Sequence, residues 1–401
     1  MKARLEFSRD PKGFFPIILV TCESEKWERC FEIYDPLHIF LKDYGASRGR
    51  YEVIRVQDER ALGFGTLNGA DGSIFDFEDS WHSVDGNLIQ LDRKVRVRAT
   101  GRSEGFRTTL LLSTTFDTGA DVRDFEYLAG ATFYRHMDLD HDGVPEHWGT
   151  YNLAFSEDKL SAPTVMGYHA NKNFYVSLIR ADVAEYDSSI LGQDLEKRFF
   201  VLDTDVGSLG FKLYDERKPT QVAFQAHYPY YEGETSYGLD RLGRPWGVFK
   251  PNKQGLIVDV SYQIRLKEAD SFIDASWDLW KYLMSLYKPV SPEIPFTLPE
   301  SLEYRIDLLN RVGYREWNRQ HDRREPVGFV INFHPEDKEA KTLANILEYG
   351  FTGHNLMNAF AFLRYGYERK DRTFIDKARR VVKFFVKNAV LENGFMHGLY
   401  N

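Results

Sequence analysis

Short β-rich runs fill the first two thirds of the chain, and several of them follow a two-residue hydrophobic period. From Leu5 to about residue 268, short runs rich in β-branched and aromatic residues are separated by Gly, Asp and Asn. Between Lys94 and Arg98, Val95 and Val97 alternate with basic residues, so the valines share one side of a strand. Many short strands with turn residues between them predict an antiparallel β-sandwich. The clearest predicted strands are 14–20, 51–56, 87–91, 95–99, 108–112, 174–179, 198–201, 221–226 and 256–266.

The pattern changes to a helical period after Glu268. Large apolar residues recur there at intervals of four and three and predict the apolar stripe of an amphipathic helix. Its members are Ile273, Trp277, Trp280, Met284 and Tyr287. The proline-containing segment 288–295 ends this helix and favours an extended connector. Thr297 and Glu300 then have the spacing of a capping box, which predicts a second linker helix.

The last sixty residues predict one helical hairpin. Residues 353–367 are apolar almost all round, which predicts a buried helix, whereas residues 372–388 separate apolar from charged positions. An inner apolar helix followed by an outer amphipathic one is the repeating unit of α/α toroids. The predicted fold class is therefore multidomain, β then α. A large β-sandwich (supersandwich) spans residues 1–268, linker helices and a connector span 269–341, and the incomplete start of an (α/α) barrel spans 342–401.

Composition narrows the function classes. The net charge is −8, and Lys and Arg are dispersed, which argues against a nucleic-acid partner. No run approaches the eighteen or so apolar residues of a membrane span, and no signal-peptide pattern is visible, so we expect a cytoplasmic rather than a secreted protein. Cys22 and Cys30 lack the spacing of metal-binding motifs and predict buried thiols. The excess of aromatic residues suits both a core and the stacking of sugar rings.

Three segments resemble those of a known family. They are Phe125–Tyr134, Ser156–Pro163 and Leu347–Asn355, and they occur in the order sandwich, linker helices and helical hairpin. In this the chain resembles bacterial glycoside hydrolases that carry a β-supersandwich before an (α/α)6 barrel. The resemblance implies a carbohydrate substrate in the barrel funnel, with catalytic carboxylates on barrel loops. Similar layouts occur in glycoside phosphorylases, so hydrolysis and phosphorolysis both stay open. The chain departs from the pattern because most of the barrel is missing.

The two outer loops of the hairpin carry the first group of candidate residues. Because antiparallel helices place the entry loop of one and the exit loop of the next at the same end, these loops should lie together. In the family that the chain resembles, this end is the funnel mouth. Glu348 is the candidate catalytic carboxylate, and its alternative role is to complement the helix dipole. The candidate sugar-binding residues are Tyr349, His354, Asn355, His397 and Tyr400, and helix capping or packing is their alternative.

Two further segments are candidates in the predicted sandwich. Tyr230, Tyr231 and Glu232 form an aromatic and acidic run that would stack on a sugar at the rim, or else cover the sandwich edge. Asp138, Asp140 and Asp142 match the first half of a calcium-binding loop. The twelfth position of that loop is Gly149 instead of a glutamate, so an acidic turn between strands is the alternative.

Two functional hypotheses follow. In the first, the chain is the N-terminal part of a glycoside hydrolase that acts on oligo- or polysaccharide. In the second, it is a non-catalytic carbohydrate-binding or assembly module. Because one hairpin cannot bury its inner helix alone, the first hypothesis requires further helices, a homo-oligomer or a second polypeptide that completes the barrel.

Overall fold

A computed structural model describes most of the chain as two compact units. The units are Met1–Pro289 and Val290–Asn401. The described residues are 2–21, 27–57, 60–115, 124–129, 132–134, 152–157, 160–182, 206–212, 222–232, 246–289, 295–317, 325–330, 347–348, 354–395 and 399–400. The predicted strand at 198–201 lies outside these ranges.

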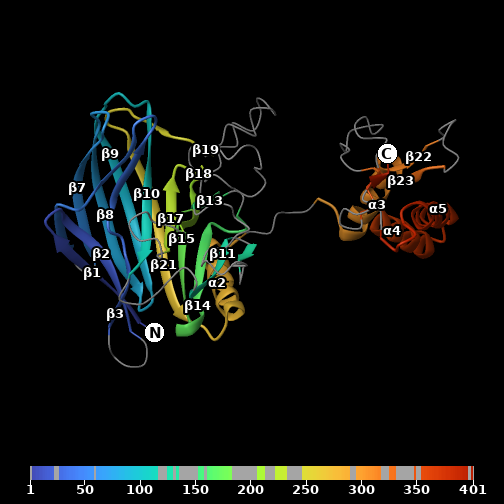
Figure 1. Cartoon of the computed structure of the whole chain (residues 1–401), viewed down its shortest axis with the longest axis horizontal. Helices are drawn as coiled ribbons and strands as arrows, with labels where there is room; N and C mark the ends of the chain where they lie inside the picture. Colours follow the sequence, from blue (N-terminus) through green and yellow to red (C-terminus); the bar gives the residue numbers. More distant parts are fainter. Residues whose placement is uncertain are drawn as a thin grey trace. The chain divides into compact units, whose positions relative to one another are not determined.

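The first unit contains two antiparallel sheets (Figure 1). The first sheet has the order β1-β2-β3-β10-β17-β16-β13, and β4, β5 and β20 join it through β10. Its strands are β1 (Lys2–Asp10), β2 (Gly13–Thr21), β3 (Glu28–Glu32), β4 (Leu37–Leu41), β5 (Gly45–Gly49), β10 (Gly105–Thr114), β13 (Asn152–Ser156), β16 (Ser208–Lys212), β17 (Ala223–Tyr228) and β20 (Lys250–Pro251). A short hairpin of β18 (Tyr231–Glu232) and β19 (Trp246–Gly247) follows β17.

The second sheet has the order β12-β11-β14-β15-β21-β9-β8-β7-β6. Its strands are β6 (Val53–Gln57), β7 (Arg60–Asn68), β8 (Ile74–Asp85), β9 (Leu88–Ala99), β11 (Phe125–Ala129), β12 (Thr132–Tyr134), β14 (Thr164–His169), β15 (Phe174–Arg180) and β21 (Ile257–Glu268). The two predicted strands at 87–91 and 95–99 are one long strand, β9, because the alternation of buried and exposed residues continues through Arg93.

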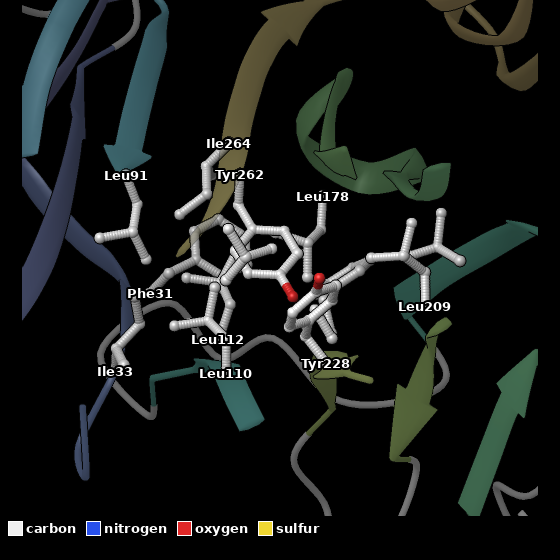
Figure 2. Packing of buried hydrophobic residues seen from close by; sticks show 14 of the residues in the cluster. Phe31, Ile33, Leu91, Leu110, Leu112, Leu178, Leu209, Tyr228, Tyr262 and Ile264 are labelled. Atoms are coloured by element: carbon white, nitrogen blue, oxygen red, sulfur yellow. The ribbon is translucent and has the colours of Figure 1, made fainter. Parts of the chain in front are cut away.

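Side chains from the inner faces of both sheets form the main core. Figure 2 shows Leu91 and Ile264 of the second sheet facing Phe31, Leu110 and Leu112 of the first. The predicted alternation in β9 is confirmed, since Val95 and Val97 are fully buried while the basic residues between and beside them are exposed. The predicted fold class of an antiparallel β-sandwich followed by helices is confirmed.

Helix α2 (Phe272–Tyr287) packs on β14 and β15 of the sandwich and belongs to the first unit. The predicted apolar stripe is wrong, because the helix turns a different face to the sheet. The buried residues are Phe272, Ala275, Leu279 and Leu283, whereas Ile273, Trp277, Trp280 and Met284 are exposed. Asp278 sets this rotation: its carboxylate accepts hydrogen bonds from Arg265 at 2.7 Å and from Tyr175 at 2.5 Å, both on the sheet. Helix α2 has two apolar faces, and the hydrogen bonds from the sheet to Asp278 decide which of them packs on the core.

The second unit is built around a helical hairpin. It contains α3 (Leu298–Leu308), a π-helical turn (Leu309–Gly313), β22 (Tyr314–Glu316), β23 (Val327–Phe329), β24 (Leu347–Glu348), α4 (His354–Arg369), α5 (Arg372–Asn388) and β25 (Leu399–Tyr400). The predicted capping box is present, since Glu300 N–H donates to the Thr297 hydroxyl and the Glu300 carboxylate accepts from Thr297 N–H. The helices of the hairpin approach closely at Gly366, where a Cβ would lie 2.8 Å from Ile375 Cγ1.

Helix α4 is buried on one side only. Ala359 and Phe362 lie in the core of the unit, whereas Met357 and Phe360 are 63% and 58% exposed. The exposed side agrees with the expectation that one hairpin cannot bury its inner helix alone, and the burial of this helix by further helices or another chain stays a prediction. Helix α5 buries Ala378, Val381 and Phe385 as its amphipathic pattern predicts, although Val382 and Val386 stay exposed.

Candidate functional site

Polar side chains gather on the outer face of the first sheet. In β10, Phe106, Leu110 and Leu112 point into the core, so Arg107, Thr109 and Leu111 occupy the opposite face. Residues that are directly opposite each other in adjacent strands have side chains on the same face of the sheet. The strand register therefore shows which residues of β4, β5 and β17 share this outer face. The pairs are Arg107 with Phe40, Thr109 with His227, Leu111 with Gln225, and His38 with Arg48.

These residues line a cleft with a volume of about 150 Å³. Its lining consists of His38, Phe40, Ala46, Arg48, Arg107, Thr109, Leu111, Lys212, Gln225, His227 and Tyr231. Arg107, Thr109, Gln225 and His227 are all buried although they point away from the core. This part of the sheet is therefore a recessed surface that is lined largely by polar side chains.

Hydrogen bonds fix the imidazole of His227. The Gln225 side-chain amide donates to the Leu153 and Phe211 carbonyls, at 2.7 and 3.1 Å, so its oxygen is left to accept from His227 Nε2 at 3.1 Å. A neutral ring protonated on Nε2 accepts on Nδ1, where the Thr109 hydroxyl lies at 2.9 Å. The sheet thus holds His227 in one tautomer and one orientation.

Both histidines of the cleft are neutral at pH 7. Burial lowers the pKa of His227 well below its ordinary value, and the positive charges of Arg107 and Lys212 lower it further. Burial likewise lowers the pKa of His38, with Arg48 as the next contributor. Nδ1 of His38 has no hydrogen-bond partner within the described part of the chain. His38 therefore brings an uncharged imidazole to the lining of the cleft, with its Nδ1 enclosed by protein atoms.

Arg107 is held by aromatic rings. Its guanidinium carbon lies 4.1 Å from the ring centre of Tyr231, 4.3 Å from that of Phe40 and 5.2 Å from that of Phe249. A Cβ on Gly247 would come within 2.5 Å of Arg107 Nη1, so glycine at this position leaves room for the guanidinium. Burial lowers the pKa of Arg107 to about 10, against which the nearby Tyr231 raises it, so the group still carries its charge at pH 7.

One of the three predicted residues after β17 belongs to this cleft. Tyr231 lines it and meets the His227 ring edge-on at 5.1 Å. Tyr230 and Glu232 are buried, and Glu232 Oε1 accepts from the Ser156 backbone N–H at 3.2 Å. For these two residues the alternative, a role in the fold of the sandwich edge, fits their burial. The proposed stacking of Tyr231 on a sugar stays a prediction.

In the second unit, the two loops of the hairpin do lie together. Strand β24 pairs with β25, so Leu347 is opposite Tyr400 and Glu348 is opposite Leu399. Asn355 is fully buried, and its Oδ1 accepts from the Phe329 backbone N–H at 2.5 Å, which fits the alternative role in the fold. His354 lies on the first turn of α4, with Nε2 3.4 Å from Asn358 Nδ2.

The remaining predicted residues are not described. Tyr349 and His397 lie outside the described ranges, and the side chains of Glu348 and Tyr400 are not described. Asp138, Asp140 and Asp142 are also outside these ranges, so the calcium site stays a prediction. Within the residues that are described, no three His, Cys, Asp or Glu side chains come together as metal ligands. None of the described helices has the length and apolar character needed to cross a membrane.

Sequence reasoning missed most of the cleft. Its signal was available as polar residues at alternate positions of strands whose other face is apolar, as in Arg107 and Thr109 of β10 and Gln225 and His227 of β17. A half-polar strand is ordinarily read as solvent-facing. Only the pairing of β4, β10 and β17 brings these side chains into one recess.

Comparisons with known proteins identify no family. No protein-family model and no curated protein matches the sequence. Among 21 matching chains of solved structures is a galactose mutarotase related enzyme from Lactobacillus acidophilus. It is 11% identical, with a TM-score of 0.31, and the alignment covers 67% of this chain and 99% of that one. A likeness at this level carries no information about the ligand or activity.

Proposed function

We propose that the first unit binds a saccharide in the cleft on β4, β10 and β17. The observation that supports this is the meeting of the Tyr231 ring with the neutral imidazoles of His38 and His227 in one recess. A sugar ring has an apolar face, which stacks on aromatic rings, and hydroxyl groups, which exchange hydrogen bonds with uncharged donors and acceptors.

The size of the cleft limits the ligand. Its volume of about 150 Å³ is below the roughly 300–1,000 Å³ of sites for drug-sized molecules. The cleft therefore suits one sugar unit, either free or at the end of a longer saccharide.

Calorimetric titration of the full chain with a panel of mono- and oligosaccharides tests this function. Binding should weaken by about two- to tenfold in Tyr231→Ala, because an aromatic contact contributes roughly 0.5–1.5 kcal/mol beyond its area. Tyr304→Ala is the matched control, since Tyr304 is 67% exposed and lies in the second unit. Absence of binding to every saccharide, or equal loss in both variants, would overturn the proposal.

A second candidate function is glycoside hydrolysis in a helical barrel. It is favoured by the exposed Met357 and Phe360 on α4, because an apolar face of this kind is ordinarily covered by further helices or by another chain. In this proposal Glu348, beside β25, is a catalytic carboxylate at the mouth of the barrel.

The test of the second candidate uses the longest polypeptide that the gene encodes. It should release reducing sugar from an oligosaccharide, and Glu348→Gln should lower kcat by roughly 10²–10⁴-fold, as expected when a general acid or base is removed. Release that depends on inorganic phosphate would assign phosphorolysis instead. If Glu348→Gln keeps full activity, this role for Glu348 is wrong.

A further inference from the structure

Buried arginines in the first unit are paired with carboxylates, with one exception. Four pairs are found among the described residues: Arg50 with Asp10, Arg93 with Asp79, Arg180 with Glu157, and Arg265 with Asp278. Arg107 is the fifth buried arginine and has neither an ion pair nor a hydrogen bond to its side chain within the described part of the chain. An unpaired cation in a buried position is costly to the fold, which indicates that a ligand supplies its partner.

The rest of the cleft has the same charge. Arg48 and Lys212 also line it, and no Asp or Glu belongs to its described lining. Neither side chain forms an ion pair with a described residue, so three cations face one recess without a counter-charge. This arrangement favours a negatively charged ligand at short range.

The contacts of Arg107 also leave its donors available. The Tyr231 and Phe40 rings hold the guanidinium by stacking, and stacking does not use the N–H groups that lie in the guanidinium plane. Its Nε is enclosed by protein atoms and has no hydrogen-bond partner among described residues, so the terminal nitrogens Nη1 and Nη2 are the donors that a ligand would meet. A planar fork of this kind matches two oxygens of a carboxylate, phosphate or sulfate group.

We infer that the saccharide bound in this cleft is acidic, and that its anionic oxygens are bound by Arg107 with Arg48 and Lys212 at the sides. This inference rests on the proposed saccharide-binding function and specifies its ligand class. Tyr231 and the two histidines then contact the sugar ring, while the cations contact the charged substituent.

Matched sugars provide the first test, by calorimetric titration of the full chain. Glucuronate and galacturonate are compared with glucose and galactose, and the 6-phosphates of both sugars form a third arm. At least one anionic class should bind about 10- to 100-fold more tightly than its neutral counterpart, as expected for a charged hydrogen-bonded pair. The class that binds best identifies carboxylate or phosphate as the substituent. Equal affinity for neutral and anionic sugars would overturn the inference and leave the saccharide function in place.

Variants provide the second test. Arg107→Gln should abolish the preference for the anionic sugar, whereas Arg55→Gln should retain it. Arg55 is a suitable control because it also lies over an aromatic ring, that of Phe64 at 5.2 Å, but is exposed on β6 of the other sheet. Gly247→Ala gives an independent variant that keeps the charge and displaces Nη1, and it should reduce the preference in part. Thermal unfolding of each variant confirms that it is folded. An anionic preference that survives in both cleft variants would overturn the role of Arg107.

Inorganic phosphate and acetate separate the two proposals. If these ions bind and no sugar does, the proposed saccharide function fails, and the cleft is an anion site of another kind. If neither ions nor sugars bind, both proposals fail.

Discussion

Two buried arginines of the first unit differ in how their charge is neutralised: Arg93 on β9 of the second sheet and Arg107 on β10 of the first. Arg93 lies between the sheets, where it donates to Asp79 at 2.7 Å and also to the carbonyls of Pro36 and Thr109. Asp79 accepts a further hydrogen bond from the Tyr51 hydroxyl. Arg107 lies on the outer face of the first sheet, and the interactions that its guanidinium makes with described side chains are with aromatic rings.

The difference separates a charge that a carboxylate neutralises within the fold from a charge that no described carboxylate neutralises. Burial lowers the pKa of both guanidinium groups, but Asp79 more than offsets this for Arg93, whose pKa is raised above its ordinary value. No carboxylate offsets it for Arg107, whose pKa is lowered. The buried charge in the core is paired with a carboxylate, whereas the buried charge in the cleft is not paired with any described one. Unpaired polar groups of this kind are expected where a protein binds its ligand.

The largest expected effect comes from breaking the core pair. Asp79→Ala leaves Arg93 buried without its partner, which should lower the free energy of unfolding by about 3–5 kcal/mol. Asp259→Ala is the control, because Asp259 is exposed and lies 3.9 Å from Lys94, so its loss should cost at most about 1 kcal/mol. Hydrogen exchange at β8 and β9 measures the first unit separately from the second. Similar protection in the two variants would mean that Arg93 does not depend on Asp79.

The cleft histidines should produce a smaller, pH-dependent effect. The folded pKa values of His38 and His227 lie below the unfolded value of about 6.5, so below that pH the unfolded state binds more protons. Stability is therefore complete above pH 6.5 and falls as the pH is lowered through the folded pKa values. The loss should reach up to about 2 kcal/mol for each histidine by pH 5, at about 1.4 kcal/mol per pH unit.

Urea unfolding between pH 7 and pH 5 measures this loss. His227→Gln should reduce the slope of stability against pH below 6.5, because the variant has one fewer group that protonates on unfolding. His82→Gln, on β8 of the other sheet, is the matched control variant. A slope that is unchanged in His227→Gln would show that the His227 ring is protonated in the folded cleft.

The sequence was sufficient for the features that depend on local pattern. The strand alternation at Val95 and Val97 and the capping box of Thr297 and Glu300 follow from neighbouring residues alone, and the structure confirms them. The rotation of α2 was not accessible in this way. Two apolar stripes fit the same helix, and the choice between them depends on Asp278 meeting Arg265, a residue on another element.

The candidate site also contains one residue that the local sequence identified and several that it did not. Tyr231 stood out by composition, but His38, Arg107 and His227 come from three strands that are distant in sequence. In the sequence Arg93 stands between Asp92 and Lys94, and Arg107 between Phe106 and Thr108. Neither pattern tells whether the side chain meets a carboxylate, and only the ladder register does so, by placing Arg93 opposite Asp79.

The smallest expected effect is also the one that tests the comparison most directly. Arg107→Met keeps an apolar side chain against Phe40 and Tyr231 and removes the unpaired charge. It should stabilise the first unit by about 1 kcal/mol, because replacing a buried charge with an apolar side chain of similar size is often stabilising. The same change at Arg93 should destabilise, because it leaves Asp79 buried without its cation. A saturating acidic sugar should reverse the order at the cleft, since the wild type gains stability from the bound ligand and Arg107→Met does not. Thermal unfolding without and with the acidic sugar measures whether Arg107→Met is more or less stable than the wild type in each condition. If Arg107→Met is as destabilising as Arg93→Met, the cleft arginine supports the fold, and the distinction between the two arginines is lost.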